Sequence, residues 1–141
     1  VEPEGMRQRL LTLGGCTVIE DCYHANPDSM RAALRVLQEY KGRHVALLGD
    51  MLELGDFSKA EHRRIGEAAA ASADLLVAVG AFAKDVAEGA QIGGMKTVYT
   101  PERAEAAALL KTLLRPGDVL LVKGSRGMRM EEILHDIFEN A

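Results

Sequence analysis

The chain has 141 residues, a length that suits one domain with a buried core. Its 21 acidic and 17 basic residues give a formal net charge of −4, so broad binding to nucleic acid or to an anionic membrane surface is not expected. No apolar run approaches the roughly 20 residues of a membrane-spanning helix, and no His or Cys group has metal-ligand spacing. We therefore expect a single cytoplasmic domain, residues 1–141, without a metal site.

The N-terminal part of the chain predicts a β-hairpin. Residues 8–13 and 16–20 resemble strands and flank Gly14-Gly15, a two-residue turn signal. The first strand should therefore run antiparallel to the second. Later apolar runs do not alternate with polar residues, as expected for parallel strands that are covered on both faces. These runs are residues 45–48, 75–79, 97–99 and 119–122.

Helical patterns separate these strands. In the first helix, apolar residues recur at i, i+3, i+4 and i+7 from Met30, with Asn26 in the N-cap position and Pro27 at the first helical position. A second helix, over residues 58–72, should open with Ser58 and Glu61 as a capping box. Further helices are expected at residues 82–90 and 101–114 and from Met130 to Ile137. This order predicts an α/β, Rossmann-like fold with about six strands, mostly parallel with one antiparallel N-terminal strand, and helices on both faces.

Polar loops follow three of the expected parallel strands, at residues 20–26, 49–56 and 123–129. One such loop alone is commonly structural, but the carboxyl ends of parallel strands share one edge of the sheet. Three polar loops at one edge indicate a binding surface. The chain has no G-x-G-x-x-G string, so a dinucleotide site of the dehydrogenase kind is not expected.

The first two loops carry groups that suit a nucleotide. Asp21 can bond amides of its own loop or accept ribose hydroxyls. Asn26 can serve wholly as a helix cap or reach an adenine edge with its amide. His24 is either an ordinary surface histidine or a side chain that hydrogen-bonds or stacks on a purine. Asp50 is either a solvated acid in a tight turn or part of the same site.

The third loop contains three cations, Lys123, Arg126 and Arg129, just before a helix, with Ser125 as a possible cap. Positive charge at a helix N-terminus opposes the helix dipole, so this cluster does not serve helix stability. It suits an anion, and Arg can bind a carboxylate through two parallel hydrogen bonds. From these residues alone, a carboxylate and a phosphate both remain open.

Three ordered motifs carry a family resemblance that covers essentially the whole chain. Residues 21–30, D-C-Y-H-A-N-P-D-S-M, resemble the D-x-Y-N-A-N-P-x-S-M signature of the Mur ligases that add D-alanyl-D-alanine to UDP-N-acetylmuramoyl-tripeptide. Residues 48–55 are similar to the L-G-D-M-x-E-L-G of that family, residues 123–126 to its K-G-S-R, and residues 5–7 to its G-M-R. His24 departs from the pattern, because the family more often has Asn there.

The resemblance implies that the chain is the third, C-terminal domain of such a ligase in the bacterial cytoplasm. ATP, as co-substrate, would be contacted by Asp21, His24, Asn26, Arg7 and Asp50. The terminal carboxylate of D-alanyl-D-alanine would be contacted by Lys123, Ser125 and Arg126. Mg²⁺ and the phosphate-gripping lysine would belong to the central domain, and the N-terminal domain would bind the UDP-sugar. This chain would then contain no catalytic residue and be inactive alone.

Two alternatives remain open. The chain could belong to another Mur ligase or to a folylpolyglutamate synthase, although the Y-x-A-N-P and K-G-S-R strings disfavour this. It could also be a free-standing, non-enzymatic nucleotide-binding module that shares the fold. An upstream phosphate-binding loop in the parent reading frame would favour the ligase, and a start codon near Val1 would favour the module.

Overall fold

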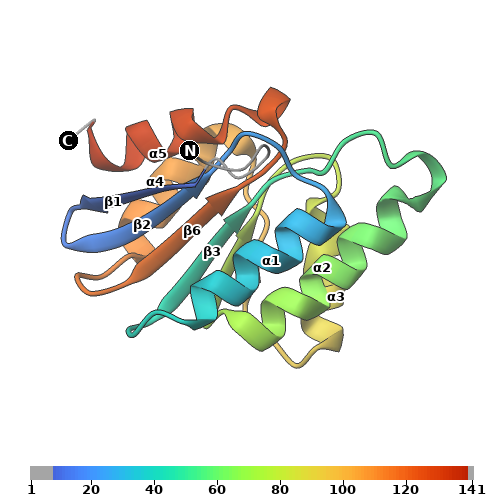
Figure 1. The fold of residues 1–141 in the computed structure, drawn as a ribbon, viewed down its shortest axis with the longest axis horizontal. Coiled ribbons are helices and arrows are strands. Elements are labelled where there is room, and N and C mark those ends of the chain that lie inside the picture. Colours follow the sequence, from blue (N-terminus) through green and yellow to red (C-terminus); the bar gives the residue numbers. More distant parts are fainter. Residues whose placement is uncertain (1–7, 140–141) are drawn as a thin grey trace.

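A computed structural model describes residues 8–139 (Figure 1). Six strands form one sheet in the order β1-β2-β6-β3-β4-β5. The strands are β1 (Arg9–Leu13), β2 (Cys16–Asp21), β3 (His44–Leu48), β4 (Leu75–Ala78), β5 (Val98–Tyr99) and β6 (Val119–Lys123). Only β1 and β2 pair antiparallel, and the other pairings are parallel. The predicted Rossmann-like sheet with one antiparallel N-terminal strand is confirmed.

Helices cover both faces of the sheet (Figure 1). The helices are α1 (Pro27–Gln38), α2 (Ser58–Ser72), α3 (Ala83–Ile92), α4 (Arg103–Leu113) and α5 (Met130–Phe138), with short 3₁₀ turns η1 (Gly55–Phe57) and η2 (Arg126–Met128). Helices α1, α2 and α3 pack on one face, and α4 and α5 pack on the other. Within residues 8–139, none of these helices has the length and apolarity needed to cross a bilayer.

The alternation of side chains along each strand divides the core into two layers. Along β2, Ile19 points to the layer under α1, whereas Val18 points to the layer under α5. The same division along β6 places Leu121 on the α1 side and Leu120 on the α5 side. The inner strands β3, β4 and β6 are therefore buried on both faces, which explains their largely apolar sequences. The division continues into the loops and decides which polar side chains meet.

The hairpin turn and the cap of α1 form as their sequences predict. Gly14 and Gly15 both have positive φ, 55° and 79°, as a tight two-residue hairpin turn requires. Asn26 caps α1 with its side chain, and Pro27 is the first helical residue.

The capping box predicted for α2 is wrong. Helix α2 begins at Ser58, directly after η1, and no side chain caps it. Glu61 pairs with Arg64 instead of reaching back to the cap position. The helix continues from a 3₁₀ turn, so its entry does not have the extended residue from which a capping side chain acts.

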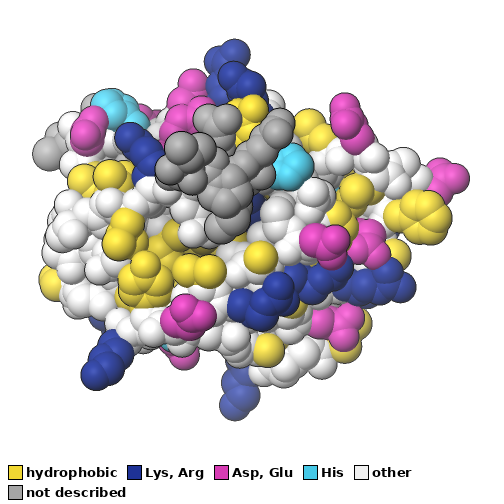
Figure 2. Space-filling view, in the orientation of Figure 1, with side chains coloured by type: hydrophobic (Ala, Val, Ile, Leu, Met, Phe, Trp, Pro, Cys, Tyr) yellow, Lys and Arg dark blue, Asp and Glu magenta, His cyan; other side chains and the backbone are white. Residues whose placement is uncertain are grey.

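The surface seen in Figure 2 mixes charges of both signs. Lys and Arg side chains lie next to Asp and Glu side chains over the helices on the right of this face, and several hydrophobic side chains gather over the sheet on its left. Phe57, which lies in η1, is among the exposed large hydrophobic residues, with 71% of its surface accessible. The functional features lie instead at the carboxyl edge of the sheet.

Candidate functional site at the carboxyl edge of the sheet

The loops after β2, β3 and β6 meet at one edge because these strands are neighbours in the order β2-β6-β3. Backbone hydrogen bonds join two of the loops: Gly49 N donates to Lys123 O at 2.8 Å, and Ser125 N donates to Asp50 O at 2.9 Å. The approach is so close that a Cβ on Gly124 would lie 3.1 Å from Gly49 Cα. The structure thus brings together the three loops that the sequence placed at one edge.

Asp21 and Lys123 form a buried ion pair at this edge. They are register partners in the parallel pairing of β2 with β6, and both side chains lie on the α1 side of the sheet. The Lys123 ammonium lies 2.9 Å from Asp21 Oδ1, with the two side chains 1% and 9% exposed. It also donates to the carbonyl of His24 at 2.8 Å, while Gln8 Nε2 donates to Asp21 Oδ2 at 3.2 Å. The pair therefore ties loop 20–26 to the end of β6.

The side chains of Asn26 and His24 meet in the turn before α1. Asn26 Oδ1 accepts a hydrogen bond from Ser29 N at 2.8 Å, and Ser29 Oγ accepts one from Asn26 N at 2.9 Å. Asn26 Nδ2 lies 3.2 Å from His24 Nε2. The side-chain oxygen of Asn26 is thus occupied in capping α1. Of the Asn26 and His24 side chains, the exposed His24 ring is the more accessible to a ligand.

Asp50 connects the second loop to the start of α3. Its two carboxylate oxygens accept hydrogen bonds from Ala81 N at 2.9 Å and Phe82 N at 3.0 Å. A Cβ on Gly80, which has a φ of +110°, would fall 2.5 Å from Asp50 Oδ1, so only glycine fits there. Asp50 is 6% exposed and holds the loop in place instead of standing in solvent.

His62 stabilises the same loop, and no sequence pattern predicts this contact. It is fully buried in α2, and its Nε2 accepts a hydrogen bond from Met51 N at 2.9 Å. Its Nδ1 lies 2.6 Å from Ser58 O, so Nδ1 carries the proton and the ring is neutral. The ring stacks on Phe82 at a centroid distance of 4.5 Å. A single histidine in an amphipathic helix carries no sequence signal that separates it from a surface residue.

Arg126 lies apart from Lys123. It opens η2, and its guanidinium carbon lies 5.5 Å from the centre of the Tyr23 ring, whereas Lys123 points under loop 20–26. Ser125 is 6% exposed, and its Oγ has no hydrogen-bond partner among residues 8–139. The three members of the predicted carboxylate-binding set therefore have different surroundings. Arg7, predicted to contact the nucleotide, lies outside the described residues.

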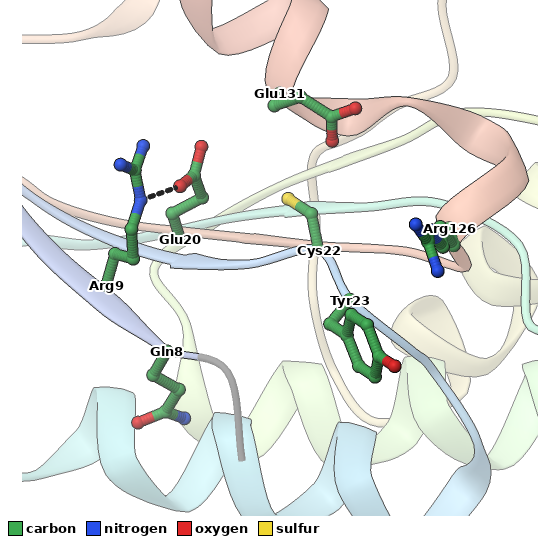
Figure 3. A pocket seen from close by; sticks show the side chains of 7 residues that line it. All are labelled: Gln8, Arg9, Glu20, Cys22, Tyr23, Arg126 and Glu131. Carbon is green, nitrogen blue, oxygen red and sulfur yellow. Dashed lines mark hydrogen bonds and ion pairs between the residues drawn. The ribbon is translucent and has the colours of Figure 1, made fainter. Parts of the chain in front are cut away.

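A cleft of about 520 Å³ opens on the α5 side of this edge (Figure 3). Arg9, Glu20 and Cys22 line it from β1 and from β2 and its end, and Arg126 and Glu131 line it from the other side. Arg9 Nε donates to Glu20 Oε1 at 2.6 Å. Burial, with the nearby Glu20 and Glu131 carboxylates, raises the pKa of the Cys22 thiol to about 12. Cys22 is therefore an uncharged wall of the cleft and not a nucleophile.

The strand order and the helices on both faces define an α/β domain of the Rossmann-like class, with its polar loops at the edge where such folds hold candidate sites. Within that class the chain belongs to the family of the Mur ligase, glutamate ligase domain, whose model matches residues 6–126.

Two kinds of comparison agree with this family. The UDP-N-acetylmuramoyl-tripeptide--D-alanyl-D-alanine ligase of Bacillus subtilis is 34% identical over 96% of this chain, and that of Mycobacterium tuberculosis strain H37Rv is 42% identical over 84%. MurF from Acinetobacter baumannii superposes with a TM-score of 0.86 at 36% identity, over 99% of this chain and 31% of that one. MurF from Thermotoga maritima, in complex with ADP, gives a TM-score of 0.80 at 25% identity, over 97% of this chain and 31% of that one. The chain spans 31% and 28% of the length of the two curated relatives.

Proposed function

We propose that this chain is the C-terminal domain of an ATP-dependent ligase that joins D-alanyl-D-alanine to UDP-N-acetylmuramoyl-tripeptide in the bacterial cytoplasm. The observation that carries the proposal is the meeting of three motif loops at one sheet edge, in a chain 34–42% identical to ligases of that name. The ADP complex of the Thermotoga maritima neighbour supports the nucleotide. The other domains of the parent ligase would be the partners of this one.

In this proposal loop 20–26 contacts the ribose and the base of ATP. A carboxylate has about four acceptor sites, so Asp21 retains lone pairs beyond those used by Lys123 and Gln8 and can accept a ribose hydroxyl. The His24 imidazole is exposed beside it and can stack on or hydrogen-bond to adenine. Asn26 contributes by fixing this turn, and Asp50 by fixing the neighbouring loop.

Arg126 is the group proposed to bind the terminal carboxylate of the dipeptide. Its planar guanidinium can donate two parallel hydrogen bonds, and it is exposed at the cleft. The Ser125 hydroxyl, buried next to it without a partner among the described residues, can add one more. Lys123 would act indirectly, because its ammonium already binds Asp21 and His24 and thereby orients the loop that carries Tyr23.

The chemistry expected of such a ligase is activation of a carboxylate followed by amide formation. ATP transfers its terminal phosphoryl group to the peptide carboxylate, the dipeptide amine attacks the acyl phosphate, and ADP and phosphate leave. Mg²⁺ would neutralise phosphate charge, and residues 8–139 contain no group of three His, Cys, Asp or Glu side chains that could hold it. We therefore assign the ion to the central domain. This domain would position the dipeptide and exclude water when it closes.

Kinetics of the full-length ligase test the proposal. A hydrogen bond to a charged group contributes about 1.5–3 kcal/mol, so Arg126→Ala should raise the KM for D-alanyl-D-alanine roughly ten- to a hundredfold. Arg126→Lys should restore only part of the loss, because an ammonium cannot make the paired contact. The KM for ATP should be unchanged, whereas Asp21→Asn should raise it. An Arg126→Ala enzyme with a raised ATP KM and a normal dipeptide KM would make the basic loop a phosphate site.

The isolated chain gives a second test. It should show no ATP hydrolysis or ligation, because the phosphate-binding loop is absent from it. Chemical shifts on titration with adenosine should change around residues 21–26, with an affinity on the order of millimolar. Turnover by the purified chain that Asp21→Asn abolishes would contradict the fragment interpretation.

A further inference from the structure

The cleft on the α5 side contains two acids and two cations, of which only one acid and one cation are paired with each other. Arg9 and Glu20 form an ion pair, with Glu20 11% exposed. The Arg126 guanidinium lies over the Tyr23 ring, and neither Arg126 nor Glu131 has an ion-pair partner among residues 8–139. The cleft thus presents one available positive and one available negative side chain.

Glu131 differs in this respect from its neighbour Glu132. Both lie in the first turn of α5 and are exposed. Glu132 accepts a hydrogen bond from Arg103 at 3.1 Å and lies 3.8 Å from Arg129, on the side away from the cleft lining. Two adjacent carboxylates in the first turn of α5 therefore have different surroundings, and of the two only Glu131 lines the cleft.

Figure 3 shows how the free charges are arranged. Glu131 lies above Cys22 in this view, and Arg126 lies to the right of Cys22, near the Tyr23 ring. Between the two charges the cleft wall is a neutral thiol and an aromatic ring. Such a wall offers no competing ion pair to a ligand that bridges the two charges.

We propose that Glu131 binds the amino group of the dipeptide while Arg126 binds its carboxylate, so that the cleft is a site for a small zwitterion. This rests on the proposed function and deepens it. Two residues of extended peptide span roughly 7 Å, so a dipeptide suits a cleft of about 520 Å³ whose lining includes both Arg126 and Glu131. The α-amino group of a free peptide is largely protonated at neutral pH, with a pKa of about 7.7–8.0, and a carboxylate is its natural acceptor. Glu131 would thereby orient the nitrogen, which attacks the acyl carbon and displaces phosphate once the ammonium has lost a proton to solvent.

The test compares Glu131→Gln with Glu132→Gln in the full-length ligase. Both changes remove one negative charge from the same turn of α5, so their effects on the helix dipole are matched. Glu131→Gln should raise the KM for D-alanyl-D-alanine about tenfold or more and leave the KM for ATP unchanged, whereas Glu132→Gln should alter neither. Glu131→Asp, which keeps the charge, should restore part of the affinity.

A desamino analogue separates a direct contact from a structural effect. Propanoyl-D-alanine lacks the amino group but keeps the carboxylate. As a competitor against the dipeptide, it should bind the wild-type enzyme more weakly than D-alanyl-D-alanine does. Glu131→Gln should abolish this preference, and Arg126→Ala should retain it while both ligands weaken.

The outcomes distinguish the two proposals. If the wild-type enzyme does not ligate D-alanyl-D-alanine at all, the proposed function fails. If ligation is normal and Glu131→Gln either matches Glu132→Gln or keeps the wild-type preference for the amino group, only the assignment of Glu131 is overturned. Thermal unfolding of each variant as an isolated chain shows whether a loss reflects folding.

Discussion

Replacement of Lys123 by Met probes the interaction on which the carboxyl edge depends. Met has a similar length and fills the same volume, so the change removes the ammonium group without opening a cavity. Within residues 8–139, Asp21 would then remain buried with the Gln8 amide as its one side-chain partner, and the His24 carbonyl would lose the Lys123 donor. Removing one partner of a buried pair costs about 3–5 kcal/mol.

The loss should be large against the total stability of the chain. Domains of this size unfold with a free energy of about 5–15 kcal/mol, so Lys123→Met should remove about a fifth of it or more. With a urea m-value of about 2 kcal/mol/M, the midpoint should fall by roughly 2 M. Urea unfolding of the isolated chain, followed by circular dichroism, measures this midpoint.

Two further variants make the reasoning refutable. Asp21→Asn combined with Lys123→Met removes the stranded charge and should recover much of the loss, because the two sites are coupled. The exposed pair of Arg63 and Glu88, with an N–O distance of 2.6 Å, is the control, and Arg63→Met should cost less than about 1 kcal/mol. A Lys123→Met chain with a loss as small as that of Arg63→Met would show that solvent reaches the pair.

Two further predictions concern ionisation and use the isolated chain. Burial alone would raise the pKa of Asp118, but hydrogen bonds from Arg43 and from the backbone of Arg115 outweigh it and hold the pKa below its ordinary value. The ionised Asp118 therefore stabilises the fold fully above about pH 4, and this stabilisation is lost as the pH falls through the lowered pKa. In urea titrations, the difference in unfolding free energy between wild type and Asp118→Asn should become smaller as the pH is lowered. A difference that does not change with pH would contradict the lowered pKa of Asp118. The pKa of the Cys22 thiol is raised to about 12, so at pH 8 it should react with iodoacetamide on the order of a thousandfold more slowly in the folded chain than in urea. Mass spectrometry of the labelled peptide measures both rates, and equal rates would refute the raised pKa.

The sequence was sufficient to predict the order of the elements, because each is specified locally. The turn at Gly14-Gly15 requires positive φ, and the cap at Asn26 has a side chain of the right length, so both formed where expected. The start of α2 was not predictable in the same way. Ser58 has the composition of a cap, but the preceding 3₁₀ turn, which depends on packing of loop 49–57, carries the chain into the helix.

The candidate site shows the same division between local and non-local information. That the three loops meet follows from parallel strands, and the structure confirms it. That Asp21 lies opposite Lys123 depends on the register of β2 with β6, which residues about a hundred positions apart cannot reveal without the sheet. Sequence reasoning therefore placed Lys123 with Arg126, its neighbour in the chain, although the ion pair draws its ammonium under loop 20–26.

The alternation of side chains along a strand explains how one sheet edge could serve two ligands. Asp21 leaves β2 toward the α1 side, and its neighbours Glu20 and Cys22 face the α5 side. In the proposed function, the nucleotide loop and the zwitterion cleft therefore lie on opposite sides of the same strand end, joined by a backbone that the buried ion pair holds in place. An amine and an acyl phosphate must be held about 3–3.5 Å apart in a defined orientation before they react. A rigid strand end that contacts both ligands supplies such an alignment without a flexible linker between the two binding loops.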